Sequence, residues 1–419
     1  MRARLLSLVA VMGSLSLLTI GYAAQNAQPA TAQPPASPTQ TAPASETAGQ
    51  SKQFTNIQVM KDIPADQVIP SMQFIKGALG VDCNFCHVTD KGHAGFALDD
   101  KRNKKTAREM MILTNTINEN PAVDKHVTCA TCHQGHNQPI NTPPVMDEAR
   151  WQETVDAKAR QAQFQQPQRA ANTPGAAGAP TPQQSRADRD KAQQAAADTI
   201  FAKYLDAVGG PAAVAKLKSL QEKGTVTTPH GDTSNFEVVR GETDKVAYTQ
   251  NTAQGGSFKL IYNGSEAVAT AGGHANAVTG FELGALKLDA GILRNIDLKP
   301  QYSRAQALPF TQKINGTEVN VVRAQLPNGQ GQETLYFDFL SGLLVRRVTV
   351  LRTAMGGVPQ QTDFSDYRDV GGVKIAFVSK VSTDENIQTR TITDAKINMP
   401  MSDDTFKLPA VEAAHPGGN

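Results

Sequence analysis

Two short segments of the chain share one spacing of cysteine and histidine. Residues 83–87 read Cys-Asn-Phe-Cys-His and residues 129–133 read Cys-Ala-Thr-Cys-His, and together they use all four cysteines. A C-x-x-C-H segment is typical of c-type haem attachment, in which each cysteine sulfur forms a thioether to a haem vinyl group and the histidine reaches the iron. The sequence therefore predicts two covalently bound haem c groups, with thioethers from Cys83, Cys86, Cys129 and Cys132 and proximal iron ligands His87 and His133.

Four cysteines could instead form two disulfides, which an oxidising compartment would allow. That alternative does not explain why a histidine directly follows the second cysteine in both segments. We therefore prefer haem attachment, and we interpret the rest of the chain as a protein built around two haems.

The first 23 residues have the organisation of an export signal. Arg2 and Arg4 precede an uncharged apolar stretch at residues 5–20, and small residues stand before the expected cut after Ala23. The stretch is shorter than the ~20 apolar residues that a membrane helix needs, although an uncleaved anchor stays an alternative. We expect a periplasmic protein, which is membrane-associated if this segment is retained.

Shifts in composition divide the remaining chain. Segments rich in Ala, Gln, Pro, Thr and Ser bury too little apolar surface to order themselves, so we interpret them as tether and linker. The expected segments are a signal peptide at 1–23, a disordered tether at 24–52, a dihaem cytochrome c domain at 53–145, a polar helix and Pro/Gln/Ala linker at 146–195, a β-rich domain at 196–410 and a tail at 411–419.

The charge balance excludes one class of partner. Lys and Arg total 41 against 39 Asp and Glu, and removal of Arg2 and Arg4 with the leader leaves 39 of each. A neutral mature chain lacks the excess of basic residues that would attract nucleic acid or an anionic membrane surface, so we expect no nucleic-acid partner.

The β-rich region alternates apolar and polar residues after two expected helices at 198–205 and 211–220. Dipeptides suited to tight hairpins separate the runs: Asn263-Gly264, Asn315-Gly316, Asn328-Gly329 and Ser341-Gly342. We expect a mainly antiparallel sheet of roughly ten strands, folded as a curved half-barrel or a sandwich. The region has no recognisable catalytic motif. The predicted fold class is thus multidomain, with a small α-helical dihaem domain followed by a β domain.

Each C-x-x-C-H segment follows an expected helix, at residues 66–79 and 104–118, which makes a repeat of about 40 residues. Met72 and Met110 lie near the middle of these helices. A methionine there could ligate the distal face of a haem iron or could be an ordinary core residue. The distinction matters because a distal methionine closes the iron, whereas an empty distal position permits small-molecule chemistry.

Residues 54–136 resemble the tetrahaem cytochrome subunit of photosynthetic reaction centres. The resemblance rests on residues 71–87 and on residues 107–118 with 127–135. It implies that Met72 and Met110, not Met111, are the distal iron ligands. The chain departs from the family by having two haem motifs instead of four, no lipid-bearing cysteine, and an added β region. The family's distal histidine is not carried over to His126, because His126 is displaced towards the motif. We therefore expect a non-photosynthetic relative without a reaction-centre partner.

The region 196–410 loosely resembles the half-barrel proteins of outer-membrane lipoprotein sorting. The resemblance rests on strand rhythm, with Tyr336-Phe337-Asp338 before the turn at Ser341-Gly342. It implies an apolar ligand or a protein partner for the β domain.

These observations predict an electron carrier rather than an enzyme, with redox proteins as partners. The alternatives are a dihaem peroxidase-like enzyme or a haem-based redox sensor with one open distal site. His93, His126 and His136 flank the motifs, and we interpret them as solvated loop residues. The basic run Lys101, Arg102, Lys104 and Lys105 is interpreted as a solvated face, or as a surface that steers an acidic redox partner.

Overall fold

The computed structural model describes residues 54–124, 126–139, 186–252, 255–383 and 386–411. The expected signal peptide and tether, the polar helix and most of the linker lie outside these residues, as does nearly all of the tail. Within the part that is described, no helix combines the length and apolar character needed to cross a membrane.

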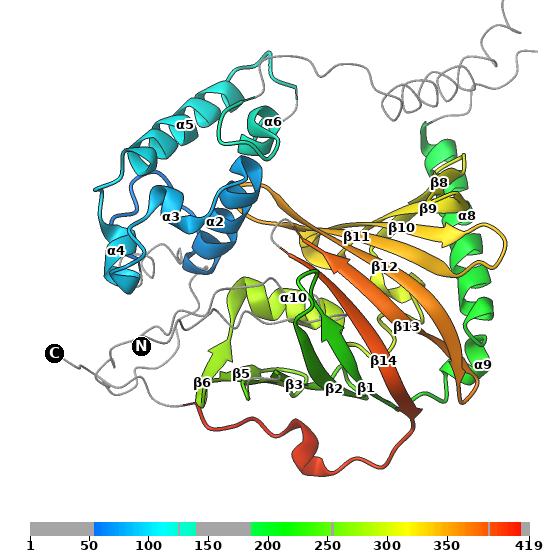
Figure 1. Ribbon diagram of the computed structural model, residues 1–419. Coiled ribbons are helices and arrows are strands. Elements are labelled where there is room, and N and C mark those ends of the chain that lie inside the picture. The colour runs from blue at the N-terminus through cyan, green and yellow to red at the C-terminus, as the bar shows by residue number, and fades with distance from the viewer. Residues whose placement is uncertain (1–53, 125, 140–185, 253–254, 384–385, 412–419) are drawn as a thin grey trace, which may run out of the picture.

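The N-terminal domain is a set of helices of very different lengths (Figure 1). Their bounds are α2 Ala65–Leu79, α3 Cys83–Cys86, α4 Gly92–Ala97, α5 Arg102–Asn118 and α6 Cys129–His133. The two long helices were expected from the sequence. Helix α2 ends at Gly80, whose left-handed φ of 63° lets its backbone N–H bond the carbonyl of Lys76. Each C-x-x-C-H motif begins a single helical turn, at α3 and at α6.

The two repeats pack crosswise. Helix α2 of the first repeat lies against α6 of the second, and α5 of the second lies against α3 of the first. A hydrogen bond of 2.9 Å from the Gly135 N–H to the Ala78 carbonyl joins the end of α2 to the turn after the second motif. The buried residues of this domain's core are Met60, Val68, Phe74, Ile75, Ala78 and Met111.

The C-terminal domain is one continuous antiparallel sheet of 14 strands. Their bounds are β1 Ser219–Thr227, β2 Thr233–Gly241, β3 Val246–Thr252, β4 Ser257–Tyr262, β5 Ala267–Ala271, β6 His274–Val278, β7 Arg304–Ala307, β8 Gln312–Ile314, β9 Thr317–Gln325, β10 Gly331–Asp338, β11 Leu344–Arg352, β12 Gly357–Val370, β13 Val373–Ser382 and β14 Ile387–Ile397. The order is β6-β5-β4-β3-β2-β1-β14-β13-β12-β11-β10-β9-β7, with β8 paired to β9.

This sheet confirms the expected fold class and decides between its two forms. The sheet is curved and unclosed, so the domain is a half-barrel and not a sandwich (Figure 1). The expected count of about ten strands was too low, because β5 to β8 contain only three to five residues each. The turn at Asn315 and Gly316 joins β8 and β9 with φ values of 50° and 83°, as a tight hairpin requires.

Helix α8 (Arg186–Ala207) corrects the expected end of the linker at residue 195. Its alanine-rich first turns favour a helix, and its polar side chains bind the edge strand β7. Asp190 accepts hydrogen bonds from Arg304 at 2.9 Å and Gln306 at 3.1 Å, and Gln194 accepts one from the Ala305 N–H at 3.3 Å. The helix thus covers an edge that would otherwise expose unpaired backbone groups. The next helix, α9, is shorter than expected, at Pro211–Val214, because residue 219 already begins β1.

The core of the β domain consists of alternate side chains of the sheet and of the helix side chains that pack against them. Phe201 and Tyr204 of α8 meet Phe337 of β10 edge-on, with ring centroids 6.0 and 5.6 Å apart. Helix α10 (Gly280–Ala290) contributes Leu286 and Ala290 to the same cluster.

The two domains contact each other through α2. The Ala354 N–H, in the turn between β11 and β12, donates a 3.1 Å hydrogen bond to Gln67 Oε1. Val358 of β12 belongs to the apolar core of the helical domain. The ring of Phe74 lies directly over Gly356, where a Cβ atom would come within 2.3 Å of it. Figure 1 shows the helical domain seated at this end of β11 and β12, beside α10.

Candidate haem attachment sites

No disulfide joins the four motif cysteines; Cys83 and Cys132 are exposed, and Cys86 and Cys129 are partly buried. Burial raises the pKa of the Cys86 and Cys129 thiols, so both are neutral at neutral pH. A single turn of helix places the two sulfurs of each motif on one side of the chain, three residues apart, with the histidine directly after them. This donor set is chemically suited to two thioether bonds and one axial nitrogen.

His87 is held by the short helix α4. Its Nδ1 lies 3.0 Å from the Phe96 carbonyl, and its ring stacks on the Phe96 ring at a centroid distance of 4.9 Å. With Nδ1 as the donor, the Nε2 lone pair is available to a metal. Burial lowers the pKa of His87, and the charges of Lys104, Arg108 and Lys101 add to that effect against the Phe96 hydrogen bond. The ring is therefore held neutral, the state that ligates iron.

His133 repeats this arrangement in the second motif. Its Nδ1 lies 2.9 Å from the His136 carbonyl, and the side chain is buried. Helix α6 begins with a capping box between Thr128 and Thr131 and ends at Gln134 in the left-handed region. The carbonyl of residue 136 is thereby turned back onto the ring. Both predicted proximal histidines thus point Nδ1 at a backbone carbonyl, and among the described residues no hydrogen bond is made to Nε2 of either ring, which fits an axial iron ligand.

The two methionines of α5 lie in different environments. Met111 is 8% exposed and belongs to the core of the helical domain, whereas Met110 is 37% exposed. Leu113, one turn further along the same face as Met110, is also exposed. Met110 and Leu113 therefore form an apolar face that a flat apolar group could cover, and Met111 does not belong to it.

Met72 of α2 is partly buried beside the core of the helical domain, and Cys129 and Ala130 of the second motif pack on the same core. The structure thus brings α2 close to the second motif and α5 close to the first. The resemblance to the reaction-centre cytochrome subunit implies that each methionine serves the motif of its own unit. The crosswise packing also places each methionine-bearing helix against the motif of the other repeat.

The basic run at the start of α5 holds the first motif instead of forming only a solvated face. Lys101 donates to the Asn84 carbonyl, and Asn103 donates to the Phe85 carbonyl at 3.1 Å. Lys104 is only 8% exposed, and its ammonium binds the carbonyls of residues 96–98 at 2.9–3.1 Å. The sequence did not predict these roles, because the pattern of an amphipathic helix does not indicate that a lysine near its start faces inward.

Asp99 completes the support of this loop. Its carboxylate pairs with Arg108 at 3.0 Å and with Lys104 at 3.1 Å. Hydrogen bonds from Arg108 and Lys104 hold the pKa of Asp99 well below its usual range, so the carboxylate is charged at all physiological pH values. Of the flanking histidines, His126 and His136 are exposed, and the side chain of His93 lies outside the described residues.

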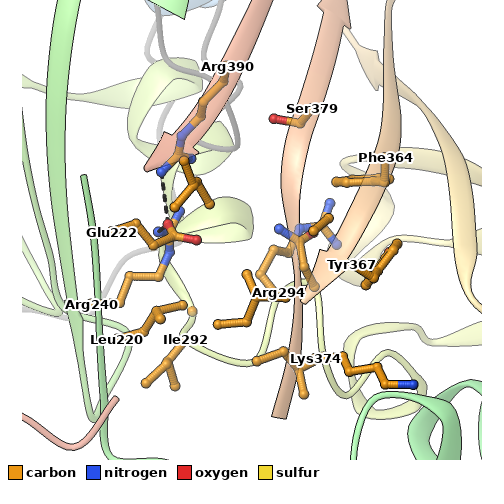
Figure 2. Close-up of a pocket in the computed structure, with 16 residues that line it drawn as sticks. Leu220, Glu222, Arg240, Ile292, Arg294, Phe364, Tyr367, Lys374, Ser379 and Arg390 are labelled. Carbon is orange, nitrogen blue, oxygen red and sulfur yellow. Dashed lines mark hydrogen bonds and ion pairs between the residues drawn. The ribbon is translucent and has the colours of Figure 1, made fainter. Parts of the chain in front are cut away.

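A small pocket with a cavity volume of about 40 Å³ opens on the β domain, between the sheet and the segment that follows α10 (Figure 2). Part of its lining is apolar: Leu220, Ile292, Ile296, Phe364, Ile375 and Ile392. The other part is charged. Figure 2 shows the carboxylate of Glu222 between Arg240 and Arg390, with N–O distances of 3.2 and 2.8 Å. Arg294 lies further along the same wall and Lys374 stands at the rim.

Next to the pocket, a second ionic cluster is fully enclosed. Glu333 pairs with Arg294 and with Arg347, and Tyr302 and Thr349 donate hydrogen bonds to it. Burial alone would raise the pKa of Glu333, but the charges of Arg294 and Arg347 outweigh burial and lower this pKa to about 2. The network therefore fixes the segment after α10 to β10 and β11 with a permanently charged carboxylate.

Comparison with known proteins identifies the helical domain as cytochrome c-like. Residues 18–183 match the family described as the photosynthetic reaction centre cytochrome C subunit, which confirms the resemblance inferred from the motifs. Over 93 residues the chain is 36% identical to cytochrome c-554 of Chloroflexus aurantiacus, which covers 20% of this chain and 21% of that protein. The chain thus spans about a fifth of the length of the relative it matches. Both matches imply covalently bound haem.

The β domain has solved structural neighbours at low sequence identity. A DUF1329 family protein from Desulfovibrio piger matches 50% of this chain and 97% of its own, with a TM-score of 0.38 and 11% identity. A LolA superfamily protein from Nitrosomonas europaea matches the same shares, with a TM-score of 0.37 and 10% identity. A putative outer membrane lipoprotein-sorting protein domain from Vibrio parahaemolyticus has a TM-score of 0.33 and 9% identity, over 45% of this chain and 89% of its own.

Proposed function

We propose that this protein is an exported dihaem c-type cytochrome that carries single electrons in the periplasm. The observation that carries the proposal is the duplicated C-x-x-C-H turn, in which each histidine directs Nδ1 to a backbone carbonyl and leaves Nε2 for iron. When bound, each haem supplies an iron that takes up or releases one electron.

Met72 and Met110 are the distal ligands in this proposal. The exposure of Met110 beside Leu113 supports its role over that of the buried Met111. Two methionine-capped irons favour an electron carrier over a peroxidase-like enzyme or a ligand sensor, because neither iron then has an open position for a small molecule. Redox proteins are the corresponding partners.

An optical redox titration of the purified full-length protein, combined with haem quantitation, tests the proposal. We expect two haems per chain, low-spin spectra in both oxidation states, and no carbon monoxide binding by the reduced protein. One haem per chain, or tight carbon monoxide binding at either haem, would overturn the dihaem carrier. The mass of the secreted chain tests export, with a mature N-terminus expected at residue 24 after cleavage behind Ala23.

We also propose a ligand for the β domain, on the strength of the pocket lining. An apolar wall next to buried guanidinium groups suits a small molecule with an apolar part and one acidic group, such as a short-chain fatty acid.

Binding of a short-chain fatty acid to the full-length protein, measured by calorimetry, tests this ligand. Lys374 lines the pocket rim, so Lys374→Glu should weaken binding severalfold by repelling the carboxylate. The matched control is Lys380→Glu, an exposed lysine further along the same strand β13, which should bind as the wild type does. Equal loss in both variants would indicate non-specific adsorption. No binding by the wild-type protein would leave a protein partner as the occupant.

A further inference from the structure

The two haem motifs differ in what surrounds the carbonyl that receives the histidine Nδ1–H. At the first motif, the Phe96 carbonyl lies 3.0 Å from His87 Nδ1 and also 2.9 Å from the ammonium of Lys104. The same ammonium bonds the next two carbonyls of the chain, at 3.1 and 2.9 Å. Lys104 is thus a buried cation that shares an acceptor with the proximal histidine.

The local charge around this carbonyl is positive. Lys104 and Arg108 both pair with Asp99, so two cations lie against one carboxylate. Lys101 adds a third cation on the Asn84 carbonyl, inside the first motif itself. Because the Lys104 ammonium is buried, water screens its charge weakly.

The second motif lacks this arrangement. His133 Nδ1 lies 2.9 Å from the His136 carbonyl. Across the described residues, no other side chain donates a hydrogen bond to that carbonyl. The two proximal histidines therefore have the same hydrogen bond but a different electrostatic environment around its acceptor.

We propose that Lys104 is a positioning residue that raises the reduction potential of the first haem, acting through the Phe96 carbonyl and His87. This inference rests on the dihaem function proposed above. A strong acceptor at Nδ1 makes the imidazole more basic and stabilises ferric iron. A cation on the same carbonyl weakens that acceptor, and its charge disfavours the more positive ferric state. Both effects favour ferrous iron at the first haem.

The redox step involved is a one-electron reduction with no bond made or broken in the protein. The ferric iron of the first haem takes one electron from an external reductant and becomes ferrous, and His87 keeps its Nδ1 proton throughout. The two haems thereby differ in reduction potential, so an electron resides preferentially on the first haem.

The test is a potentiometric titration of the full-length Lys104→Met variant beside the wild type. Removal of the cation should lower one of the two midpoint potentials and leave the other unchanged. We expect a three- to tenfold change in the reduction equilibrium, which is about 28–59 mV for a one-electron couple. The Cys129→Ala/Cys132→Ala chain retains only the first motif and so assigns the shifted potential.

Two further variants keep the outcome decisive. Lys105→Met removes a charge from the adjacent, exposed lysine and should leave both potentials unchanged. Lys104→Arg preserves the charge and should retain the higher potential. If Lys104→Met fails to incorporate haem, the potential of Lys104→Arg still tests whether a cation at this position is what matters. An unchanged potential in Lys104→Met, or an equal shift in Lys105→Met, would overturn the role of Lys104. Haem content and spectra report on the dihaem function itself, so failure of that proposal is separately visible.

Discussion

At the scale of single residues, the neighbouring methionines of α5 separate a ligand role from a packing role. Met110→Ala should open one haem, because the exposed side chain that we propose as a distal ligand is lost. We expect the reduced variant to bind carbon monoxide at one of its two haems, with a changed optical spectrum.

Met111→Ala is the matched control for that substitution. Met111 is buried in the helical core, so its truncation should lower the free energy of unfolding by ~2–4 kcal/mol without opening an iron. Carbon monoxide binding by the Met111 variant and not by the Met110 variant would show that Met111 is the distal ligand and Met110 is not.

Glu333 gives the β domain a specific pH dependence. Its pKa is about 2 in the folded chain against an ordinary value of 4.5. The stabilisation from its charge is therefore complete above pH 4.5 and is lost as the pH falls towards 2, by ~3 kcal/mol in total. Denaturant unfolding of the β domain, followed by circular dichroism at several pH values, measures this loss.

The Glu333→Gln variant separates the contribution of Glu333 to the pH dependence of stability from that of the other carboxylates. It should be less stable than the wild type at neutral pH, because Arg294 and Arg347 then lie buried without their carboxylate. The difference between the two proteins should shrink between pH 4.5 and pH 2. A constant difference over that range would show that Glu333 does not change its protonation there.

Residue identity alone predicts which cysteines and histidines would hold haem, but not the groups that surround them in the structure. The four cysteines and two histidines follow from a fixed local spacing, which covalent chemistry demands. The roles of Lys104 and of the Phe96 carbonyl depend on how α4 folds back onto residue 87, and the sequence does not encode that approach as a pattern. Glu333 was missed for a similar reason, because its two arginine partners come from distant segments.

At the scale of elements, the short helix α4 depends on one glycine. A Cβ atom at Gly95 would lie 2.1 Å from the Val88 carbonyl oxygen, directly after His87. Gly95→Ala should therefore push α4 away and break the bond between His87 Nδ1 and Phe96. We expect reduced incorporation of the first haem, measured as haem per chain, with the second haem unaffected.

Gly284→Ala provides the control for this substitution. It lies in α10, where the nearest atom to an added Cβ is 3.5 Å away, so ordinary contact results. Because alanine also favours the helix, this variant should be as stable as the wild type or slightly more stable. Full haem content in Gly95→Ala would show that α4 can move without loss of the site.

Elements with strong local signals were predicted well, and weak ones were not. The helices at 65–79 and 102–118 and the long strands show clear periodicity. Strands β7 and β8 are too short to alternate visibly, and they exist because β9 offers both of them a pairing edge. The start of α8 was misplaced because its alanine- and glutamine-rich turns resemble a linker until β7 provides their contacts.

At the scale of the whole molecule, α2 joins the two functions that we propose. The same helix carries Met72, packs against the second motif and rests on the turn between β11 and β12. Its contacts with the β domain include a hydrogen bond from Ala354 to Gln67, an apolar seat around Phe74, Met355 and Val358, and packing against α10. These contacts make α2 the element through which we expect a change in the β domain to reach the helical domain.

Phe74→Ala tests the seat directly. Phe74 is buried and its ring covers Gly356, so truncation removes contacts from both domains at once. We expect a loss of ~3 kcal/mol from the stability of the helical domain. Amide hydrogen exchange should show faster exchange in α2 and at Ala354, with strands β13 and β14 unchanged.

Phe339→Ala makes the same truncation at an exposed position beyond the end of β10, where the ring lies under Lys203 at 5.7 Å. It should leave exchange in α2 as in the wild type. If Phe74→Ala also leaves α2 and Ala354 protected, the seat is not what holds the domains together. If it speeds exchange there and shifts one haem potential as well, the β domain and the haem unit are energetically coupled through the α2 contact, because the substitution changes that contact and lies outside both haem motifs.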